Sequence, residues 1–301
     1  MRKTVKRVFI TGATGFVGSA VVPDLLNAGY QVVGLARSDE AAAALVAAGG
    51  EAYRGDLQDL ESLRGGAELA DAVVHIAFDH DFSKLGESCE MDRQAITAIG
   101  AAMEGSDKPL IVTSGLPVTF GRIATENDVP PSGDHGIPRV SEQTAMSMIE
   151  RGVRPSVVRM PQVHDEMKQG FATYLLAHAR EKGVSAYVGD GLNRWPAVHR
   201  FDAARLYRLV LEKGAAGERY HAVAEEAVPV REVAEAIGRG LNIPVVALSP
   251  ENSASHFGWL DRIAKMDVPA SSALTQERLG WHPTEQSSFI ADLRLSSSSQ
   301  A

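Results

Sequence analysis

Short apolar and β-branched runs recur along the first half of the chain, and they alternate with segments of helical period. The runs are RVFIT (7–11), QVVGLA (31–36), EAYRGD (51–56), AVVHIAF (72–78), PLIVTS (109–114) and PSVVRM (155–160). SDEAAAALVAAGG (38–50) predicts a helix with Ser38 as its N-cap. Strands that alternate with helices build a parallel sheet with helices on both faces, so we expect a doubly wound α/β fold.

Beyond residue 160 the alternation of apolar runs and helical segments becomes less regular. GFATYLLAHAREKG (170–183), DAARLYRLVLEKG (202–214) and VREVAEAIGRGL (230–241) predict helices, the second with Asp202 as N-cap, and RYHAVA (219–224) predicts a strand. We expect residues 1–160 to form one domain and residues 161–295 a second, mixed region that returns some elements to the first sheet. The ending LRLSSSSQA (293–301) is low in apolar residues and predicts a frayed tail.

Composition narrows the classes of function. The chain has 301 residues, 45% of them hydrophobic, and a net charge of −8, which argues against a nucleic-acid partner. No apolar stretch approaches the length of a membrane span or a secretory signal, so we expect a cytoplasmic protein without a membrane partner. The single cysteine, Cys89, has no His or Cys at ligand spacing, and we expect a small, partly buried side chain and no metal site.

A glycine loop stands between the first predicted strand and the helix that follows it. Gly12, Gly15 and Gly18 form G-x-x-G-x-x-G, the spacing that permits a tight turn, close approach to a diphosphate and packing of the helix on the strand. Amide groups at the start of such a helix bind phosphate charge. We therefore predict a dinucleotide site whose loop contacts come from Gly12, Thr14, Gly15, Phe16, Val17 and Gly18.

The end of the second predicted strand distinguishes between two dinucleotides. An acidic residue at this place binds the ribose 2′-hydroxyl of NAD. Here Arg37 and Ser38 occupy it, and a planar cation with a hydroxyl suits a 2′-phosphate. Asp39 and Glu40 come slightly later and fit the first turn of the next helix. The sequence therefore favours NADP(H) over NAD(H).

Several motifs together resemble the extended and atypical short-chain dehydrogenase/reductase superfamily, in its epimerase/dehydratase-like branch. They are TGATGFVG, LARS, RGDL, VVHIAF, TSG, VVRMP, WPAVHRFDAARL and TQERLGWHP, and they run from residue 7 to about residue 285. The resemblance implies a Rossmann-type doubly wound parallel sheet with a smaller mixed α/β C-terminal substrate domain. It also implies that the nicotinamide lies in the cleft between them, and that a small molecule is the substrate.

The resemblance assigns cofactor and substrate contacts to the residues that follow four of the strands. They are Asp56 and Leu57 at the adenine, Ala77 and Phe78 at the ribose and diphosphate, Thr113 and Ser114 beside the substrate carbonyl, and Met160, Pro161 and Val163 at the nicotinamide. A buried strand-end residue without a ligand is the alternative for each of them. Relatives pair through the helices after the fourth and fifth strands, so a monomer or a homodimer is expected.

The Tyr-x-x-x-Lys pair of this superfamily is missing. Alignment of PRVSEQTAMSMIERG (138–152) places Pro138 at the tyrosine and Glu142 at the lysine, and no tyrosine lies between residues 54 and 173. The tyrosine donates a proton to the carbonyl oxygen, and the lysine cation lowers its pKa. Proline has no proton to donate, and a carboxylate disfavours an anionic neighbour.

Other side chains are candidates for the proton donor. His164, beside Asp165, is the best placed histidine because it follows the nicotinamide-facing segment, and the other candidates are His135, Tyr174, Tyr187 and His199. We interpret His75 as a satisfied interior imidazole. Asp92 falls near an active-site asparagine of the superfamily, but a helix-surface acid is the preferred interpretation. Tyr174, Trp195 and Trp259 either wall the substrate pocket or belong to the core.

Three functions remain open from the sequence. The first is an NADP-dependent oxidoreductase that transfers hydride to a small carbonyl-type substrate next to Ser114. The second is a cofactor-binding sensor without turnover, and the third is a nucleotide-sugar-type epimerase or dehydratase. General acid–base assistance is worth about 10²–10⁴-fold, whereas alignment of hydride donor and acceptor supplies about 7–11 kcal/mol. Loss of the tyrosine therefore does not by itself abolish hydride transfer.

Overall fold

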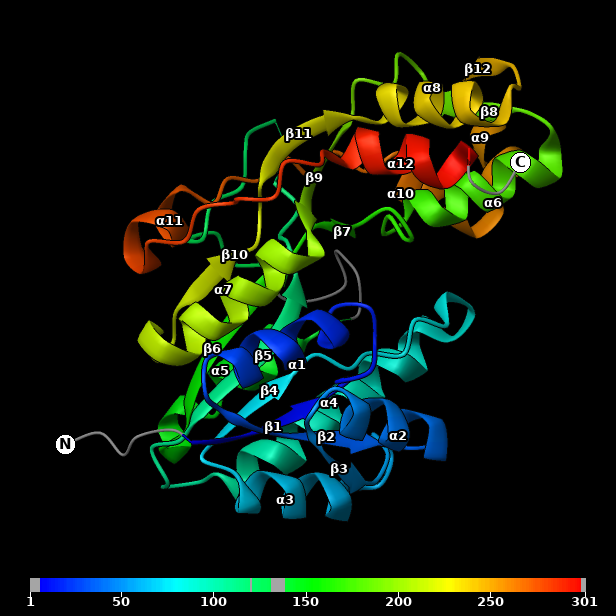
Figure 1. Cartoon of the computed structure of the whole chain (residues 1–301). Helices are drawn as coiled ribbons and strands as arrows, with labels where there is room; N and C mark the ends of the chain where they lie inside the picture. Colours follow the sequence, from blue (N-terminus) through cyan, green and yellow to red (C-terminus); the bar gives the residue numbers. More distant parts are fainter. Residues whose placement is uncertain (1–5, 120, 131–138, 299–301) are drawn as a thin grey trace.

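A seven-stranded parallel sheet forms the larger part of the molecule (Figure 1). The computed structural model describes residues 6–119, 121–130 and 139–298, with side chains up to residue 293. The predicted site residues His135 and Pro138 lie outside the described residues. The strands run in the order β10-β6-β5-β4-β1-β2-β3. Their bounds are β1 (Arg7–Thr11), β2 (Gln31–Ala36), β3 (Glu51–Arg54), β4 (Ala72–His75), β5 (Pro109–Gly115), β6 (Arg154–Met160) and β10 (Arg219–His221).

Helices cover both faces of this sheet, as the alternating pattern predicts. One face carries α1 (Gly18–Asn27), α2 (Asp39–Ala47) and α7 (Arg200–Lys213), and the other carries α3 (Leu60–Leu69), α4 (Leu85–Ala102) and α5 (Ser141–Met146). Successive side chains of a strand point to opposite faces, so Val8 and Ile10 pack with the first set and Phe9 with the second. Because both faces are buried, the strands are nearly continuous apolar runs.

The smaller part of the molecule lies above the carboxyl edge of the sheet in Figure 1. A three-stranded sheet joins β7 (Gln162–His164), β9 (Arg194–His199) and β11 (Glu225–Pro229), and a two-stranded one joins β8 (Ser185–Val188) to β12 (Val245–Leu248). A separate apolar core holds it together. Its helices are α6 (Ala172–Lys182), α8 (Val230–Leu241), α9 (Pro250–Phe257), α10 (Asp261–Ala264) and α12 (Phe289–Ser298), with the 3₁₀ turn η3 (Gly258–Leu260). The helix α11 (Ala273–Leu279) packs instead on β10 and α7 of the larger part. The 3₁₀ turns η1 (Phe82–Lys84) and η2 (Ile149–Arg151) precede α4 and β6.

Elements from the second half return to the first sheet. β10 pairs in parallel with β6, and α7 lies beside α1 in Figure 1. Asp202 is not the N-cap of α7, contrary to the sequence prediction, because the helix begins at Arg200 and its cap is His199. The Asp202 carboxylate instead accepts hydrogen bonds from the backbone nitrogens of Thr284 and Glu285, at 2.9 and 3.1 Å. It thereby ties the C-terminal segment to α7.

The C-terminus is more ordered than the sequence suggested. α12 extends to Ser298, so the prediction of a frayed tail from residue 293 is wrong over residues 293–298. Phe289 and Leu293 lie one helical turn apart and are both fully buried in the core of the smaller part. Two buried anchors four residues apart stabilise a helix that ends in three serines.

Neither a membrane-spanning helix nor a metal-binding cluster occurs among the described residues. Within the described residues, every helix is too short or too polar to cross a membrane. Groups of three or more His, Cys, Asp or Glu side chains arranged around a common metal position are likewise absent from the described part. Cys89 is buried on α4, as expected.

Candidate functional site

The glycine loop joins β1 to α1 and lies against the segment that follows β4. Gly12 has a φ of +73°, and a Cβ there would lie 2.7 Å from the backbone nitrogen of Ala77. A Cβ on Gly18 would lie 2.0 Å from the carbonyl oxygen of Gly12. Both spaces are too small for any side chain, so only glycine lets the loop and the start of α1 close onto the sheet.

The start of α1 leaves its positive end open to a ligand. Its N-cap, Val17, makes no side-chain hydrogen bond, and the first turn carries no acidic residue. Thr14 and Gly15 are exposed beside it. First-turn amide groups and the helix dipole therefore suit a diphosphate at this place.

Two cations from the second half of the chain lie next to this loop. The Lys168 Nζ and the Arg200 guanidinium carbon lie 5.8 and 5.4 Å from the centre of the Phe16 ring. Asp165 holds Arg200 through a contact of 2.9 Å. Both cations raise the positive potential beside the loop, and sequence reasoning missed them because they are distant in the chain and belong to no motif.

The ends of β2 and β3 carry the residues predicted to select the dinucleotide. Arg37 is exposed, and the Ser38 hydroxyl oxygen caps α2 by accepting a hydrogen bond from the backbone nitrogen of Ala41 at 3.2 Å. A side-chain hydrogen bond from Ser38 lowers the pKa of the Glu40 carboxyl, so a phosphate would compete with Glu40 for the Ser38 proton. Asp39 forms an ion pair with Arg54. Asp56 accepts a hydrogen bond from the backbone nitrogen of Gln58 at 2.9 Å.

A buried polar chain lies beneath the carboxyl ends of β1 and β4. His75 Nδ1 is 2.8 Å from Thr11 Oγ1, and its Nε2 is 3.1 Å from Asp92 Oδ1. Asp92 Oδ2 accepts a hydrogen bond from Ser141 Oγ. Asp92 is only 1% exposed, so the interpretation of a helix-surface acid is wrong. His75 is an interior imidazole with both nitrogens bonded, as predicted.

The ionisation of Asp92 fixes the direction of these bonds. Burial alone would raise the pKa of the Asp92 carboxyl, but His75, Arg139 and Ser141 outweigh it, and the pKa lies below its ordinary value. A carboxylate only accepts hydrogen bonds, so His75 Nε2 donates to it and Nδ1 accepts from the Thr11 hydroxyl. The glycine-loop strand is thereby connected to α4 and α5.

The carboxyl end of β5 is fixed from both sides. Thr113 Oγ1 donates to the carbonyl oxygen of His75 at 2.8 Å and lies 2.6 Å from the Tyr207 hydroxyl, which therefore donates to it. Burial raises the pKa of Tyr207 well above its ordinary value. Arg139 Nη2 donates to the carbonyl oxygen of Thr113 at 3.0 Å. Ser114, the next residue, is 7% exposed.

His164 lies in the interior of the smaller part. Its Nδ1 is 2.7 Å from Asp292 Oδ2 of α12, and its ring packs edge-on against His199 at 5.5 Å. Burial lowers the pKa of His164, although Asp292 opposes this effect. A hollow of about 200 Å³ beside both imidazoles is also lined by Glu225 and Glu285. These contacts favour a structural role, and a catalytic role for His164 stays a prediction.

Aromatic side chains from three segments meet above the sheet. Phe82 stacks on Trp259 with ring centres 5.2 Å apart and contacts Phe171 at the same separation. Tyr174 meets Trp259 edge-on at 5.3 Å. Trp259 is 51% exposed, so this cluster reaches solvent, whereas Trp195 is fully buried and belongs to the core. Tyr187 lies on β8 beneath Arg231.

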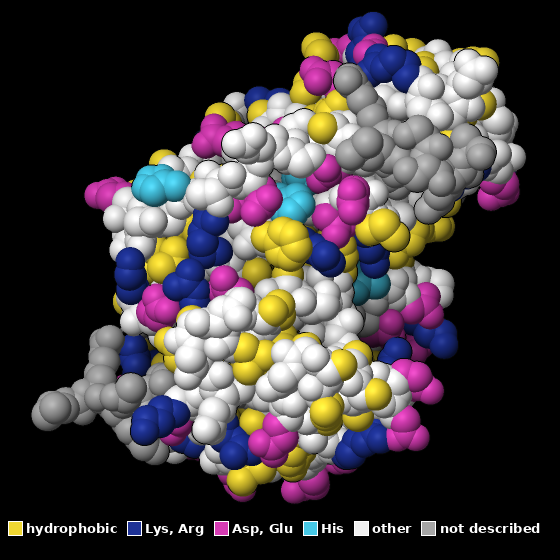
Figure 2. All heavy atoms as spheres, in the orientation of Figure 1, with side chains coloured by type: hydrophobic (Ala, Val, Ile, Leu, Met, Phe, Trp, Pro, Cys, Tyr) yellow, Lys and Arg dark blue, Asp and Glu magenta, His cyan; other side chains and the backbone are white. Residues whose placement is uncertain are grey.

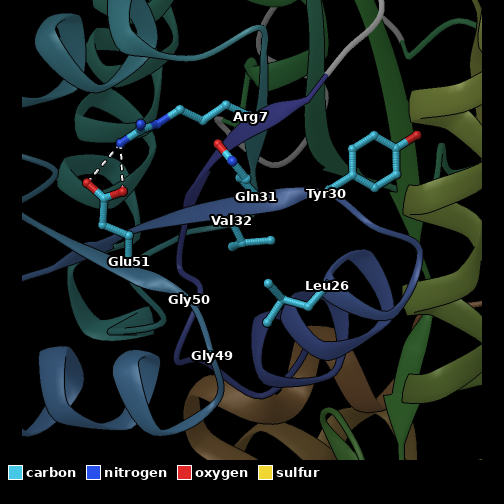
Figure 3. A pocket seen from close by; sticks show the side chains of 8 residues that line it. All are labelled: Arg7, Leu26, Tyr30, Gln31, Val32, Gly49, Gly50 and Glu51. Carbon is cyan, nitrogen blue, oxygen red and sulfur yellow. Dashed lines mark hydrogen bonds and ion pairs between the residues drawn. The ribbon is translucent and has the colours of Figure 1, made fainter.

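A second hollow, of about 440 Å³, lies at the opposite edge of the sheet (Figure 3). The starts of β1, β2 and β3 line it, and an ion pair of 2.7 Å joins Arg7 to Glu51 there. Ligands of doubly wound sheets bind at the carboxyl edge, so this hollow is not the expected cofactor site. Figure 2 shows Lys and Arg side chains interspersed with Asp and Glu over the described part of one face.

Comparison with known proteins identifies the family. The profile of a family described as NAD(P)H-binding matches residues 12–183. The chain belongs to this NAD(P)H-binding family. An uncharacterized protein of Schizosaccharomyces pombe is 49% identical over 292 residues, covering 95% of this chain and 98% of the relative. The UDP-glucose 4-epimerase of Streptomyces lividans is 25% identical and covers 92% of each chain.

Solved structures of an epimerase and a dehydratase share the fold of this NAD(P)H-binding protein. The dTDP-glucose 4,6-dehydratase DesIV from Streptomyces venezuelae, solved with NAD and TYD bound, aligns with a TM-score of 0.75 at 21% identity and covers 97% of this chain and 95% of that one. The UDP-glucose 4-epimerase of Thermotoga maritima aligns with a TM-score of 0.73 at 19% identity, covering 97% of each chain. The predicted fold class is therefore confirmed.

Glu142, at the position of the superfamily lysine, has a different partner in this NAD(P)H-binding protein. It is 2% exposed, and both of its oxygens accept hydrogen bonds of 2.8 Å from the fully buried Arg159. Arg219 forms a further ion pair with it. A carboxylate held by two guanidinium groups cannot act as the lysine cation does. The alignment of Glu142 with the superfamily lysine itself stays a prediction.

The family fold gathers the predicted cofactor and substrate residues along one edge. Ser114 and Gly115 of β5 are paired with Arg159 and Met160 of β6, so Ser114 lies beside the start of the predicted nicotinamide segment. The glycine loop touches Ala77, and Phe78 follows it. The close backbone packing at Gly12 and Gly18, the open start of α1 and the nearby cations fit a dinucleotide. A bound nicotinamide would supply hydride at this edge.

Proposed function

We propose that the protein is an NADP-dependent oxidoreductase that transfers hydride to a carbonyl group of a small molecule beside Ser114. The glycine loop carries this proposal, because glycine at positions 12 and 18 lets the loop and the start of α1 close onto the sheet, and the first-turn amide groups of α1 are then open to a diphosphate. Phe16 and Val17 complete the loop. Lys168 and Arg200 add positive charge at the same place.

The 2′-phosphate of NADP(H) is proposed to lie against Arg37 and Ser38. Arg37 is exposed, whereas Asp39 is engaged by Arg54, and the 2′-phosphate would compete with Glu40 for the Ser38 proton. A guanidinium binds a phosphate through two parallel N–H groups, which a ribose hydroxyl cannot match. Asp56 and Leu57 of the next strand end are proposed to flank the adenine.

Substrate and nicotinamide are proposed to meet between the ends of β5 and β6. Met160, Pro161 and Val163 would face the nicotinamide, and the Ser114 hydroxyl would donate to the substrate carbonyl oxygen. A donor aimed at developing negative charge is worth about 10²–10³-fold in kcat. The aromatic cluster of Phe82, Phe171, Tyr174 and Trp259 supports an apolar substrate.

Turnover of NADPH tests this proposal. Purified protein is mixed with NADPH and a panel of aldehydes, ketones and imines, and the absorbance of the reduced nicotinamide is followed. Ser114→Ala is expected to lower kcat/KM by about 10²-fold with an unchanged NADPH affinity. Ser156→Ala is the matched control, since Ser156 is a similarly buried serine on β6. Equal rates in both variants would remove Ser114 from the mechanism.

A cofactor-binding sensor is the second candidate. The buried ion pair between Glu142 and Arg159 favours it, because this arrangement removes the lysine of the superfamily. Tight NADPH binding without turnover of any acceptor would support the sensor over the oxidoreductase. The same ion pair weakens the third alternative, an epimerase or dehydratase, since reversible oxidation of a sugar hydroxyl needs a competent base.

A further inference from the structure

Arg139 lies at the carboxyl end of β5, where the proposed substrate carbonyl would sit. Its Nη2 donates to the carbonyl oxygen of Thr113 at 3.0 Å, and its Nε donates to Ser141 Oγ at 2.8 Å. The guanidinium carbon lies 4.1 Å from the centre of the Phe78 ring. The plane of the guanidinium is therefore fixed between the residue before Ser114 and the residue after Ala77.

Among the contacts with described residues, part of the guanidinium stays available. Arginine has five N–H groups, and the two hydrogen bonds above use two of them. Asp92 lies 3.9 Å from Nε, but its oxygens are already bonded to His75 and Ser141. The Arg139 side chain is 19% exposed. A cation with spare donors thus stands at the edge of the site.

We propose that Arg139 takes over the task of the missing tyrosine by binding the carbonyl oxygen of the substrate and stabilising the alkoxide formed from it. This inference rests on the proposed hydride transfer. As hydride from the reduced nicotinamide bonds to the carbonyl carbon, the C=O π pair moves to oxygen, and the resulting alkoxide takes a proton from water. The guanidinium keeps its own proton throughout, because arginine is effectively always charged.

The surroundings of Arg139 hold it in place. In the sequence it directly follows Pro138, which aligns with the tyrosine. Ser141 Oγ accepts a hydrogen bond from Arg139 Nε and donates one to Asp92, which His75 anchors to the glycine-loop strand. Ser141 and Asp92 are therefore positioning residues. Fixing a donor before the reaction is what makes an electrostatic site effective.

A row of rings leads from Arg139 to the exposed Trp259 and indicates the substrate class. The Phe78 and His80 rings are 5.3 Å apart, those of His80 and Phe82 are 5.9 Å apart, and Phe82 stacks on Trp259. A carbonyl oxygen at Arg139 would place the rest of the molecule along this row. An aromatic aldehyde or ketone fits, since its ring adds stacking contacts.

Binding of benzoate to the protein–NADP⁺ complex tests the role of Arg139 without turnover. The benzoate carboxylate imitates the negative oxygen, and its ring imitates the substrate ring. We expect calorimetry to show at least tenfold weaker benzoate binding in Arg139→Ala, an intermediate loss in Ser141→Ala, and NADP⁺ affinities within twofold of the unsubstituted protein. Arg154→Ala is the matched control. The Arg154 side chain is 17% exposed and pairs with an aspartate, Asp107, but Arg154 is the first residue of β6 and so lies at the edge of the sheet opposite to the proposed site.

Reduction of benzaldehyde provides the second readout. Arg139→Ala is expected to lose about 10²–10³-fold in kcat/KM. Added guanidinium ion is expected to restore part of this rate, whereas sodium chloride at equal ionic strength is not. If Arg139→Ala does not fold, Arg139→Gln replaces it, since its amide preserves packing and hydrogen bonding but removes the charge.

The outcomes separate this inference from the proposed function. Arg139-dependent benzoate binding without reduction of any carbonyl compound would support the oxyanion site and contradict the oxidoreductase. Benzaldehyde reduction at the same rate in Arg139→Ala would support the oxidoreductase and overturn the role of Arg139. Benzoate binding that is absent from the unsubstituted protein, or equal in Arg139→Ala, would also overturn it.

Discussion

At the scale of single residues, selection between the two dinucleotides depends on Arg37. We expect Arg37→Ala to weaken NADPH binding by about 1–3 kcal/mol and to leave NADH binding nearly unchanged, because only the 2′-phosphate offers a charge-assisted partner. Calorimetric titration with both dinucleotides measures the difference. Arg64→Ala is the control, since Arg64 is a partly exposed arginine on α3 that pairs with Glu61. Equal losses for NADPH and NADH would contradict the assignment.

Residues in local motifs could be predicted, whereas residues brought together by the fold could not. The spacing of Gly12 and Gly18 and the capping by Ser38 follow from the few residues around them, and the structure agrees at each. Asp92 looked like a surface acid because its burial depends on His75 and Ser141, which come from a strand and another helix. Arg139, Lys168 and Arg200 carry no local signal, since their contacts arise only when distant segments meet.

At the scale of elements, the predicted strands and helices largely match the structure. β1 and β2 have the predicted bounds, because each is an uninterrupted buried run. The run at 72–78 was predicted too long, as β4 ends at His75 and the chain then passes the glycine loop. α12 was missed because Phe289 and Leu293 reveal a helix only once a core exists for them to enter.

The attachment of α12 depends on the bond between His164 and Asp292. Asp292→Ala is expected to lower the free energy of unfolding by about 1–3 kcal/mol, because it leaves a buried His164 N–H without an acceptor. Asp292→Asn retains an acceptor oxygen and is expected to lose less. Chemical denaturation measures both variants, with the exposed Asp190 changed to Ala as control. Equal losses in Asp292→Ala and Asp190→Ala would show that this bond does not hold the helix.

At the scale of the whole molecule, the two parts are connected by more than the chain between them. The first sheet takes β10 from the second half, and α7 packs on α1. The boundary at residue 160 therefore stays a proposal about cofactor and substrate regions, and the choice between monomer and homodimer stays a prediction. Return of distant strands could be expected from the resemblance, but the particular strand could not, because RYHAVA carries no signal for its partner β6.

The connection between β10 and β6 makes global stability depend on pH. His221 is fully buried, its Nδ1 donates to the carbonyl oxygen of Ser271 at 2.7 Å, and its Nε2 accepts from Arg159 Nη1 at 3.1 Å. Protonation of His221 would place an imidazolium cation beside the Arg159 guanidinium. Burial and Arg159 therefore lower the pKa of His221 from 6.5 to about 4, although the nearby carboxylates of Glu126 and Glu142 oppose this shift.

Between these two pKa values the unfolded chain binds a proton at this site and the folded chain does not, so stability rises with pH. The contribution of His221 is complete above pH 6.5 and is lost as pH falls towards 4, about 3 kcal/mol in all. Urea denaturation at pH 7, 6, 5 and 4 measures the loss. His221→Gln keeps an acceptor for Arg159 but cannot titrate, so its stability is expected to fall less steeply with pH, whereas exposed His282→Gln should retain the full slope. The same slope in both variants would mean that another group carries the pH dependence.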